Sequence, residues 1–172
     1  MNVEQAITTA LEYEARVHKT YHEALEASKT PVARRIFKTL RDEEAEHVRF
    51  LKDRLEEWKA DGVVTTPMLD SVLVPKDLIE RGVHALRASV EKEGIKGHDT
   101  ELEHLRRALE VERETSAFYE RMVGELDGDG RRLFERFVEI EQGHLALVQA
   151  EINCVTGSGF WFDTAEFSLE MG

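Results

Sequence analysis

Glu44 and His47 are the residues of this sequence whose types and spacing best suit metal chemistry. They lie three positions apart in RDEEAEHVRFL, residues 41–51, which has the apolar spacing of an amphipathic helix. Three residues advance a helix by about 300°, so both side chains leave one face and can reach one metal ion. A single Glu-x-x-His arises by chance in a glutamate-rich chain. The interpretation therefore depends on whether the pair recurs.

The pair recurs at Glu141 and His144, because the chain contains an internal repeat. RRIF at residues 34–37 aligns with RRLF at residues 131–134, and in this register the second Glu-x-x-His falls on the first. Two hydrophobic segments, ALEYE and ALEVE, match in the same way and end at Glu14 and Glu112. The two alignments differ in register by one residue, which indicates a duplicated helical hairpin.

Six side chains consequently fall on the apolar seams of four predicted helices: Glu14, Glu44, His47, Glu112, Glu141 and His144. Ionised carboxylates in a bundle core cost several kcal/mol each and repel one another, so cations between them are expected. Two glutamates plus two Glu-x-x-His pairs are typical of dinuclear carboxylate bundles. Oxygen-rich ligation with one imidazole per metal favours two iron ions, with manganese possible. The alternative is a water-filled polar seam of buried Glu–His pairs.

Other candidates lack this support. Glu101 and His104 form a third Glu-x-x-His, but they align with apolar positions and are predicted to lie on the surface. The remaining histidines have no repeat mates and are treated as ordinary: His18, His22, His84 and His98. Tyr21 and Tyr119 follow the lone glutamates by seven residues, two turns further along the ligand face. They are either core aromatic residues or hydrogen-bond donors to ligand carboxylates.

Four helices are expected to position these residues, at about 2–28, 31–60, 99–125 and 131–156. Asn2 with Gln5 forms a capping box, and Thr30 before Pro31 is a cap for the second helix. Residues 61–98 are a long crossover containing a short amphipathic helix. The sequence therefore predicts an all-α, up-down-down-up four-helix bundle of ferritin-like kind over residues 1–157, followed by an aromatic tail at residues 158–172.

Composition restricts the partners and the location. The 172-residue chain is 41% hydrophobic with a net charge of −12, which argues against nucleic acid and anionic membranes and favours cations. The single cysteine, Cys154, excludes an internal disulfide and suits a buried small residue in a reducing compartment. No apolar run reaches membrane length, and the start of the chain lacks a signal-peptide pattern. A cytoplasmic location is expected.

Over about residues 2–156 the chain resembles the rubrerythrin and bacterioferritin branch of the ferritin-like superfamily. The motifs that carry the resemblance are ALEYE with its tyrosine, EEAEH, ALEVE with its tyrosine, and EIEQGH. The resemblance implies that Glu44 and Glu141 bridge two metals and that Glu14 and Glu112 are terminal ligands, with one histidine on each metal. It also implies reduction of hydrogen peroxide or oxidation of ferrous iron by oxygen or peroxide.

Departures from the family narrow these expectations. Rubrerythrins carry an additional glutamate where this chain has Thr115, so a six-ligand site with Thr115 beside it is expected. Ala45 replaces the haem-ligand methionine of bacterioferritins, so no haem is expected. The chain has no rubredoxin domain, so electrons come from an external protein or from ferrous iron. The tail, with Phe160, Trp161, Phe162 and Phe167, is unlike a cage helix and is predicted to form a homodimer.

The predicted function is a non-haem di-iron oxidoreductase that reduces hydrogen peroxide or oxygen. Two alternatives stay open. One is a metal-binding or iron-handling module without turnover, and the other is a di-iron oxygenase of an organic substrate.

Overall fold

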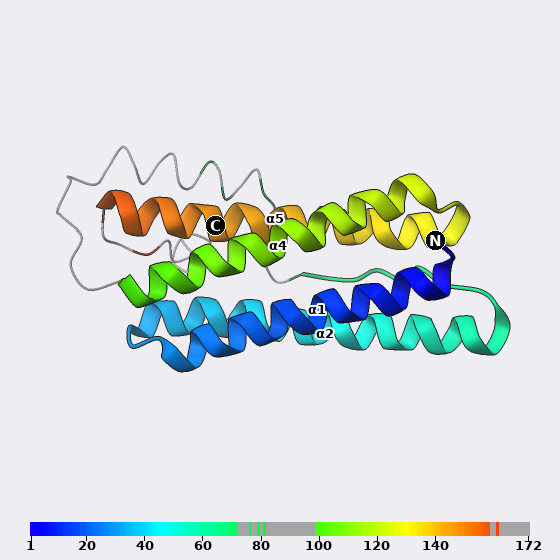
Figure 1. Cartoon of the computed structure of the whole chain (residues 1–172), viewed down its shortest axis with the longest axis horizontal. Helices are drawn as coiled ribbons and strands as arrows, with labels where there is room; N and C mark the ends of the chain where they lie inside the picture. Colours follow the sequence, from blue (N-terminus) through cyan, green and yellow to red (C-terminus); the bar gives the residue numbers. More distant parts are fainter. Residues whose placement is uncertain (72–75, 77–78, 80, 82–98, 159–160, 162–172) are drawn as a thin grey trace.

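The computed structural model describes residues 1–71, 76, 79, 81, 99–158 and 161. Over this part the chain is all-helical, without strands, as the sequence predicts (Figure 1). The long helices are α1 (Val3–Ala27), α2 (Pro31–Asp61), α4 (Asp99–Glu125) and α5 (Gly128–Ser158). The predicted short helix of the crossover lies almost wholly outside the described residues, and so does most of the aromatic tail.

Local sequence signals set the helix ends. At the start of α1, Asn2 Oδ1 accepts the backbone N–H of Gln5 at 2.8 Å, and the Gln5 side chain accepts the N–H of Asn2 at 3.2 Å. This confirms the predicted capping box. Thr30 occupies the N-cap of α2, but its hydroxyl makes no cap hydrogen bond, so that part of the prediction is wrong. Gly62 ends α2 with a φ of 67°, a left-handed conformation that glycine adopts without a steric penalty.

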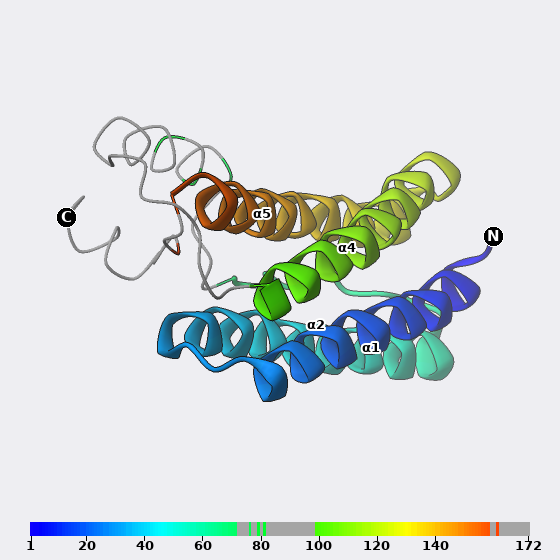
Figure 2. The same cartoon turned by 60° about the vertical axis from the view of Figure 1, so that its left-hand side comes forward.

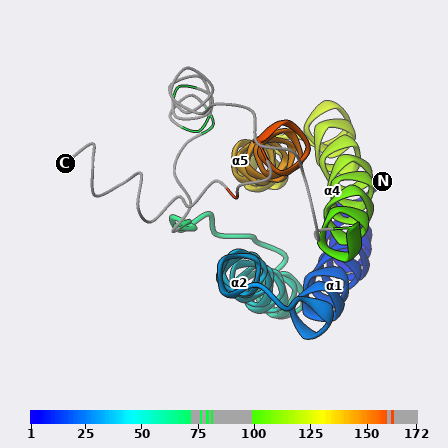
Figure 3. The ribbon, with the colours of Figure 1, turned by 90° about the vertical axis from the view of Figure 1, so that its left-hand side faces the viewer.

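The helices pack as two antiparallel hairpins. Close backbone contacts join α1 to α2, α4 to α5 and α1 to α4, and Figure 2 shows the same pairs from a second direction. α1 and α5 run in one direction, whereas α2 and α4 run in the other (Figure 1). Seen end-on, the order α2, α1, α4, α5 forms an arc with α2 and α5 at its ends (Figure 3). α5 begins at Gly128, inside the predicted turn at residues 126–130.

Two clusters of buried apolar side chains fill the interior. One contains Val17 from α1 and Leu40 from α2, and the other contains Ala10 and Leu51 from the same two helices. α4 and α5 divide between the clusters in the same way. The predicted ligands lie between the two clusters on every helix, so the core positions the polar residues at one level of the bundle.

Residues 62–71, the first part of the crossover, run back along α2. Thr65 bonds to Glu57 at 2.9 Å, and Ser71 bonds to Glu43 at 2.6 Å. Six extended residues span about 20 Å, and fourteen helical residues span about 21 Å, so the two contacts fit one antiparallel register. On the other side, the Arg136 guanidinium of α5 donates two hydrogen bonds to the carbonyl of Leu69. The segment therefore covers the side of the bundle between α2 and α5.

Trp161 is the one described residue of the tail beyond α5. It is half-buried, and its ring meets that of Phe37 edge-on, with 6.0 Å between the centroids. Cys154 is buried, as expected. None of the four described helices contains a stretch with the length and apolarity of a membrane span.

Candidate metal centre

The structure brings the six predicted ligands together at the centre of the bundle. Each of them is 0–1% exposed. They form two groups in which one potential ligand atom from each residue lies within 4.8 Å of the others. The groups are Glu14, Glu44, His47 and Glu141, and Glu44, Glu112, Glu141 and His144. These buried Glu and His residues could hold metal ions, and the two groups share Glu44 and Glu141.

His47 faces the carboxylates with its Nδ1 atom. This atom lies 3.2 Å from Glu14 Oε2, 3.2 Å from Glu44 Oε2 and 3.7 Å from Glu141 Oε1. The three carboxylates come from three helices, and the imidazole is the shared neighbour of all of them. Nε2, on the far side of the ring, points away from this group and is buried without a hydrogen-bond partner among the described residues.

His144 repeats this arrangement from α5. Its Nδ1 atom lies 2.8 Å from Glu44 Oε1, 3.6 Å from Glu112 Oε1 and 3.8 Å from Glu141 Oε2. The two imidazoles stack with an interplanar angle of 10° and 5.3 Å between their centroids. The internal repeat of the sequence thus appears as a local two-fold arrangement, in which one oxygen of Glu44 lies beside Nδ1 of each ring.

The two tyrosines donate hydrogen bonds to the lone glutamates, each across to the other hairpin. Tyr21 on α1 donates to Glu112 on α4, and Tyr119 on α4 donates to Glu14 on α1. Burial, together with the charge of the accepting glutamate, raises the pKa of both phenols well above the usual value. The hydroxyls therefore stay protonated and act as donors. Both tyrosines are also fully buried in the apolar clusters, so the two interpretations of these residues hold together.

Two of the four carboxylates are protonated more readily than usual. Burial, together with the charge of Glu44, raises the pKa of Glu14 to about 8. Burial and the charge of Glu112 raise the pKa of Glu141 well above its usual range. Both shifts arise because desolvation and like charges disfavour a second and third carboxylate anion at one place. Without cations the cluster therefore retains protons.

The pKa values of the two imidazoles are also raised, but for a histidine this favours the charged form. Burial opposes the charge on His47, but Glu44 and Glu14 outweigh burial and raise its pKa to about 10. Burial likewise opposes the charge on His144, and Glu44 and Glu141 raise its pKa well above the usual value. Burial alone would raise the pKa of Glu44, yet the two imidazolium charges hold it well below its usual range. Protons thus supply the positive charge that balances the buried anions.

Several carboxylate oxygens of the donor set lack hydrogen bonds and could instead bind a metal ion. Both oxygens of Glu44 lie close to an imidazole nitrogen but without hydrogen-bond geometry. Both oxygens of Glu141 and Oε2 of Glu112 are also buried without a hydrogen-bond partner among the described residues. Buried carboxylate oxygens are normally satisfied, because leaving them unsatisfied carries a desolvation penalty. The unsatisfied oxygens are concentrated on the residues shared between the two groups. Two cations between the helices would satisfy these atoms at once.

The side chains of Thr115 and Glu101 both bond to backbone groups. Thr115 is fully buried, but its hydroxyl donates at 3.0 Å to the carbonyl of Val111 in its own helix. Glu101 is 3% exposed, so its assignment to the surface is wrong. Its carboxylate accepts a hydrogen bond from the backbone N–H of Lys29 at 3.2 Å. Glu101 thereby links α4 to the connection between α1 and α2. Neither Glu101 nor His104 belongs to a potential metal-binding group in the described part of the chain.

Glu43 is a site residue that sequence reasoning missed. It forms a third group with His47 and His144, again with ligand atoms within 4.8 Å of one another. Its Oε2 atom lies 3.8 Å from Nε2 of His144. The repeat could not reveal this residue, because the equivalent position in α5 is Ile140. The available signal was the Glu-Glu doublet and the four-residue spacing from Glu43 to His47, which places both on one helix face.

Comparisons of the chain with protein-family models, with curated proteins and with solved structures find no match.

Proposed function

We propose that this chain is a ferritin-like dinuclear metal protein that acts as a non-haem di-iron oxidoreductase on hydrogen peroxide or oxygen. The observation that carries the proposal is the pair of four-residue groups that share Glu44 and Glu141. A shared carboxylate has two oxygens and can bind two ions, so two overlapping groups suit two neighbouring metals. The antiparallel hairpins and the parallel course of α2 and α4 support a ferritin-like bundle (Figure 1).

In this proposal each residue has a defined role. Glu44 and Glu141 would be ligands to both ions. Glu14 and His47 would complete one ligand set, and Glu112 and His144 would complete the other. The histidines bind through Nδ1, the atom that faces the carboxylates. Oxygen-rich ligation with one nitrogen per ion favours iron, with manganese as the second candidate.

The bound iron pair would supply the redox chemistry by cycling between ferrous and ferric states. The protein fixes the ligands and excludes bulk water, because the six side chains are buried between two apolar clusters. Tyr21 and Tyr119 orient the terminal glutamates from the opposite hairpin. The depth of burial suits small oxidants such as peroxide and oxygen. Electrons would come from an external donor protein or from ferrous iron.

Metal content tests the site. Metal-free protein is loaded anaerobically with ferrous iron, and bound iron per chain is measured after gel filtration. We expect two ions for the wild type and loss of the pair in Glu44→Ala and in Glu141→Ala. Glu46→Ala is the matched control, because Glu46 is exposed on the same helix and pairs with Arg49. Two ions retained in the double variant of Glu44 and Glu141 would refute the assignment.

Reaction with oxidant tests the activity. Ferrous protein is mixed with hydrogen peroxide or oxygen, and iron oxidation is followed by absorbance. Rapid oxidation, followed by re-reduction and repeated consumption of oxidant, supports the oxidoreductase. Bound iron that stays inert supports the metal-binding module instead. Consumption of oxidant only when an organic compound is added supports the oxygenase.

A further inference from the structure

Glu43 differs from the six proposed ligands in its contact with solvent. It is 7% exposed, whereas the ligands are 0–1% exposed. Its Oε2 atom accepts a hydrogen bond from the Ser71 hydroxyl at 2.6 Å and lies 3.8 Å from His144 Nε2, which is longer than a hydrogen bond. Glu43 therefore connects the crossover at the surface with the buried imidazoles.

The outer edges of the two imidazoles face this carboxylate. Nδ1 of each ring is directed at the proposed ligands, so Nε2 lies on the opposite side. Nε2 of His47 and Nε2 of His144 are buried and lack a hydrogen-bond partner among the described residues. Because the two rings stack, these nitrogens lie on the same side, and together with Glu43 they form a compact group of cation donors.

This group lies on the side of the bundle between α2 and α5, where the helices pack less closely than elsewhere. Backbone contacts close the sides between α1 and α2, α1 and α4, and α4 and α5. α2 and α5 lie at the ends of the arc, and residues 62–71 cover the side between them (Figure 3). A cation that enters there would pass this extended segment and not a pair of closely packed helices. Entry on the other sides would require two helices to separate.

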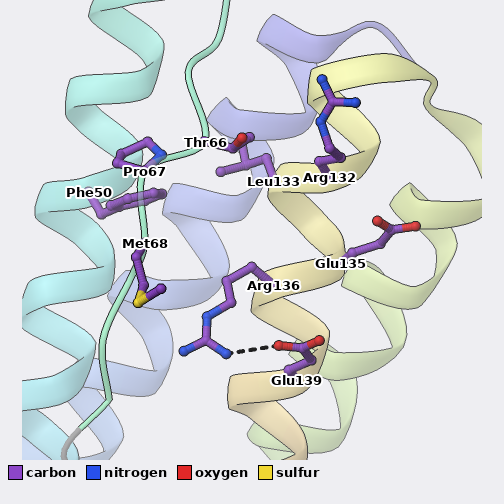
Figure 4. Close-up of a pocket in the computed structure, with 9 residues that line it drawn as sticks. All are labelled: Phe50, Thr66, Pro67, Met68, Arg132, Leu133, Glu135, Arg136 and Glu139. Atoms are coloured by element: carbon purple, nitrogen blue, oxygen red, sulfur yellow. Dashed lines mark hydrogen bonds and ion pairs between the residues drawn. The ribbon is translucent and has the colours of Figure 1, made fainter.

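Within that side, the level of Ser71 differs from the level of Met68 in what lies behind the surface residues. A groove of about 580 Å³ lies beside Met68, between Phe50 of α2 and Leu133 of α5 (Figure 4). Behind the groove, Phe50 packs edge-on to Phe137, and Phe137 packs edge-on to His47. Aromatic rings thus separate the groove from the site. One turn of α2 away from His47 in the other direction, Glu43 offers a carboxylate.

We propose that Glu43, with the outer edges of His47 and His144, is a transfer site through which divalent cations reach the dinuclear centre. This inference rests on the proposed function, since it presupposes that metals bind at the centre. Each imidazole of the metal-free protein has to release one proton before it can bind an ion. A neutral imidazole has one lone pair, so a histidine that binds an inner ion through Nδ1 keeps its remaining proton on Nε2. The outer position is therefore vacated as the inner positions fill. Ser71 holds the carboxylate in place at the entrance.

Metal-loading kinetics test the proposal. Metal-free full-length protein is mixed with Co²⁺ in a stopped-flow instrument, and the visible absorbance of the bound ion is followed. A chelator is then added to measure release. The variants are Glu43→Gln and Ser71→Ala, and the control is Glu46→Gln on the exposed face of the same helix. Circular dichroism checks that each variant is folded.

We expect Glu43→Gln to slow loading by about tenfold or more, because a carboxylate at an entrance raises the local cation concentration. Release should slow by the same factor, since ions leave by the route they enter. The number of ions at saturation and the equilibrium affinity should stay unchanged. Ser71→Ala should slow loading by a smaller factor, and it provides an independent test if the Glu43 variant does not fold.

Several results would overturn the proposal. Unchanged loading rates in both variants would exclude transfer through Glu43 while leaving the two-ion centre intact. Weaker affinity with faster release and normal loading would make Glu43 a residue that positions His144. A third ion retained at saturation would make this a permanent site. Failure of the wild type to bind Co²⁺ and ferrous iron would refute the proposed function itself, which is a distinct outcome.

Discussion

The hydroxyl of Tyr119 on α4 donates a hydrogen bond to Oε1 of Glu14 on α1. In the matching contact, the hydroxyl of Tyr21 on α1 donates to Glu112 on α4. Glu14 and Glu112 are thus each held by a tyrosine of the hairpin to which they do not belong. The contact links the core packing of one half of the chain to the position of a buried carboxylate in the other.

Tyr119→Phe should weaken metal binding by about 10- to 100-fold, the range seen when outer hydrogen-bond partners of metal ligands are lost. The phenylalanine ring preserves the packing, so the effect reports the lost hydrogen bond to Glu14. Competition with a chelator of known affinity measures it. Tyr13→Phe is the control, because Tyr13 is half-buried and stacks on Phe118. Equal effects of the two substitutions would contradict the prediction.

Metal affinity should rise with pH. At pH 7 Glu14 and His47 are protonated in the metal-free protein, because their pKa values are raised to about 8 and about 10. A metal ion that takes these ligands must displace their protons, so binding releases protons and strengthens as the pH increases. Calorimetric titrations in buffers of different ionisation enthalpy count the released protons. An affinity that is independent of pH between about 6 and 8 would contradict these assignments.

The metal-free protein should show the opposite dependence in its stability. The raised pKa of Glu14 means that the folded state binds the extra proton, so stability falls as pH rises from 4.5 to about 8. The contribution of His47 is fully present below pH 6.5 and is lost as pH rises through about 10. Glu44, whose pKa is lowered, loses its contribution as pH falls through acid values below 4.5. Urea unfolding of chelator-treated protein should therefore show a mildly acidic optimum.

A flat or alkaline optimum for the metal-free protein would show that these three groups do not govern its stability. The metal-loaded protein provides the comparison. Its stability should increase with pH over the same range, because binding to the folded state alone stabilises it, and the affinity rises.

Arg136→Ala should loosen the crossover. The guanidinium donates two hydrogen bonds to the carbonyl of Leu69, and losing them should cost about 1 kcal/mol. In a chain of this size that lowers the melting temperature by about 2–4 °C. Faster amide hydrogen exchange in residues 62–71 should accompany the change. Arg132→Ala is the control, since Arg132 lines the same groove but pairs with Asp129 on its own helix (Figure 4).

The predicted homodimer depends on the aromatic tail. Light scattering of the full chain at micromolar concentration should give the mass of a dimer, and deletion of residues 158–172 should give a monomer. The one described tail residue beyond α5, Trp161, packs on Phe37 of its own chain. A full chain that is already monomeric, and unchanged by the deletion, would contradict the prediction.

The sequence was sufficient to predict the four long helices and the clustering of the six central residues because both depend on periodicity. Helical spacing places Glu44 and His47 on one face, and the repeat supplies their counterparts. Burial and clustering then follow from the apolar neighbours on each helix. The repeat could not predict residues that have no equivalent in the other half of the chain. Glu43 was missed because its mate is Ile140, and its partner Ser71 comes from a segment without periodicity.

Two other differences come from contacts that depend on tertiary structure. Glu101 aligns with an apolar position in the repeat, which excluded it from the metal site and led to the prediction that it is exposed. The connection between α1 and α2 covers it, and it accepts the N–H of Lys29. Thr30 has the right type and position for a cap, but its hydroxyl is buried without a hydrogen-bond partner among the described residues. Local propensity identified the cap position and could not determine the orientation of that side chain.

The exchange of hydrogen bonds between Tyr21 and Glu112 and between Tyr119 and Glu14 also bears on how such a chain originates. One hairpin carries one lone glutamate, one Glu-x-x-His and one tyrosine, which is half of the inner ligand set and half of its support. Two identical hairpins would together supply all of it. The centre is thus a symmetric interface enclosed within a single polypeptide, as expected if a duplication joined two hairpins.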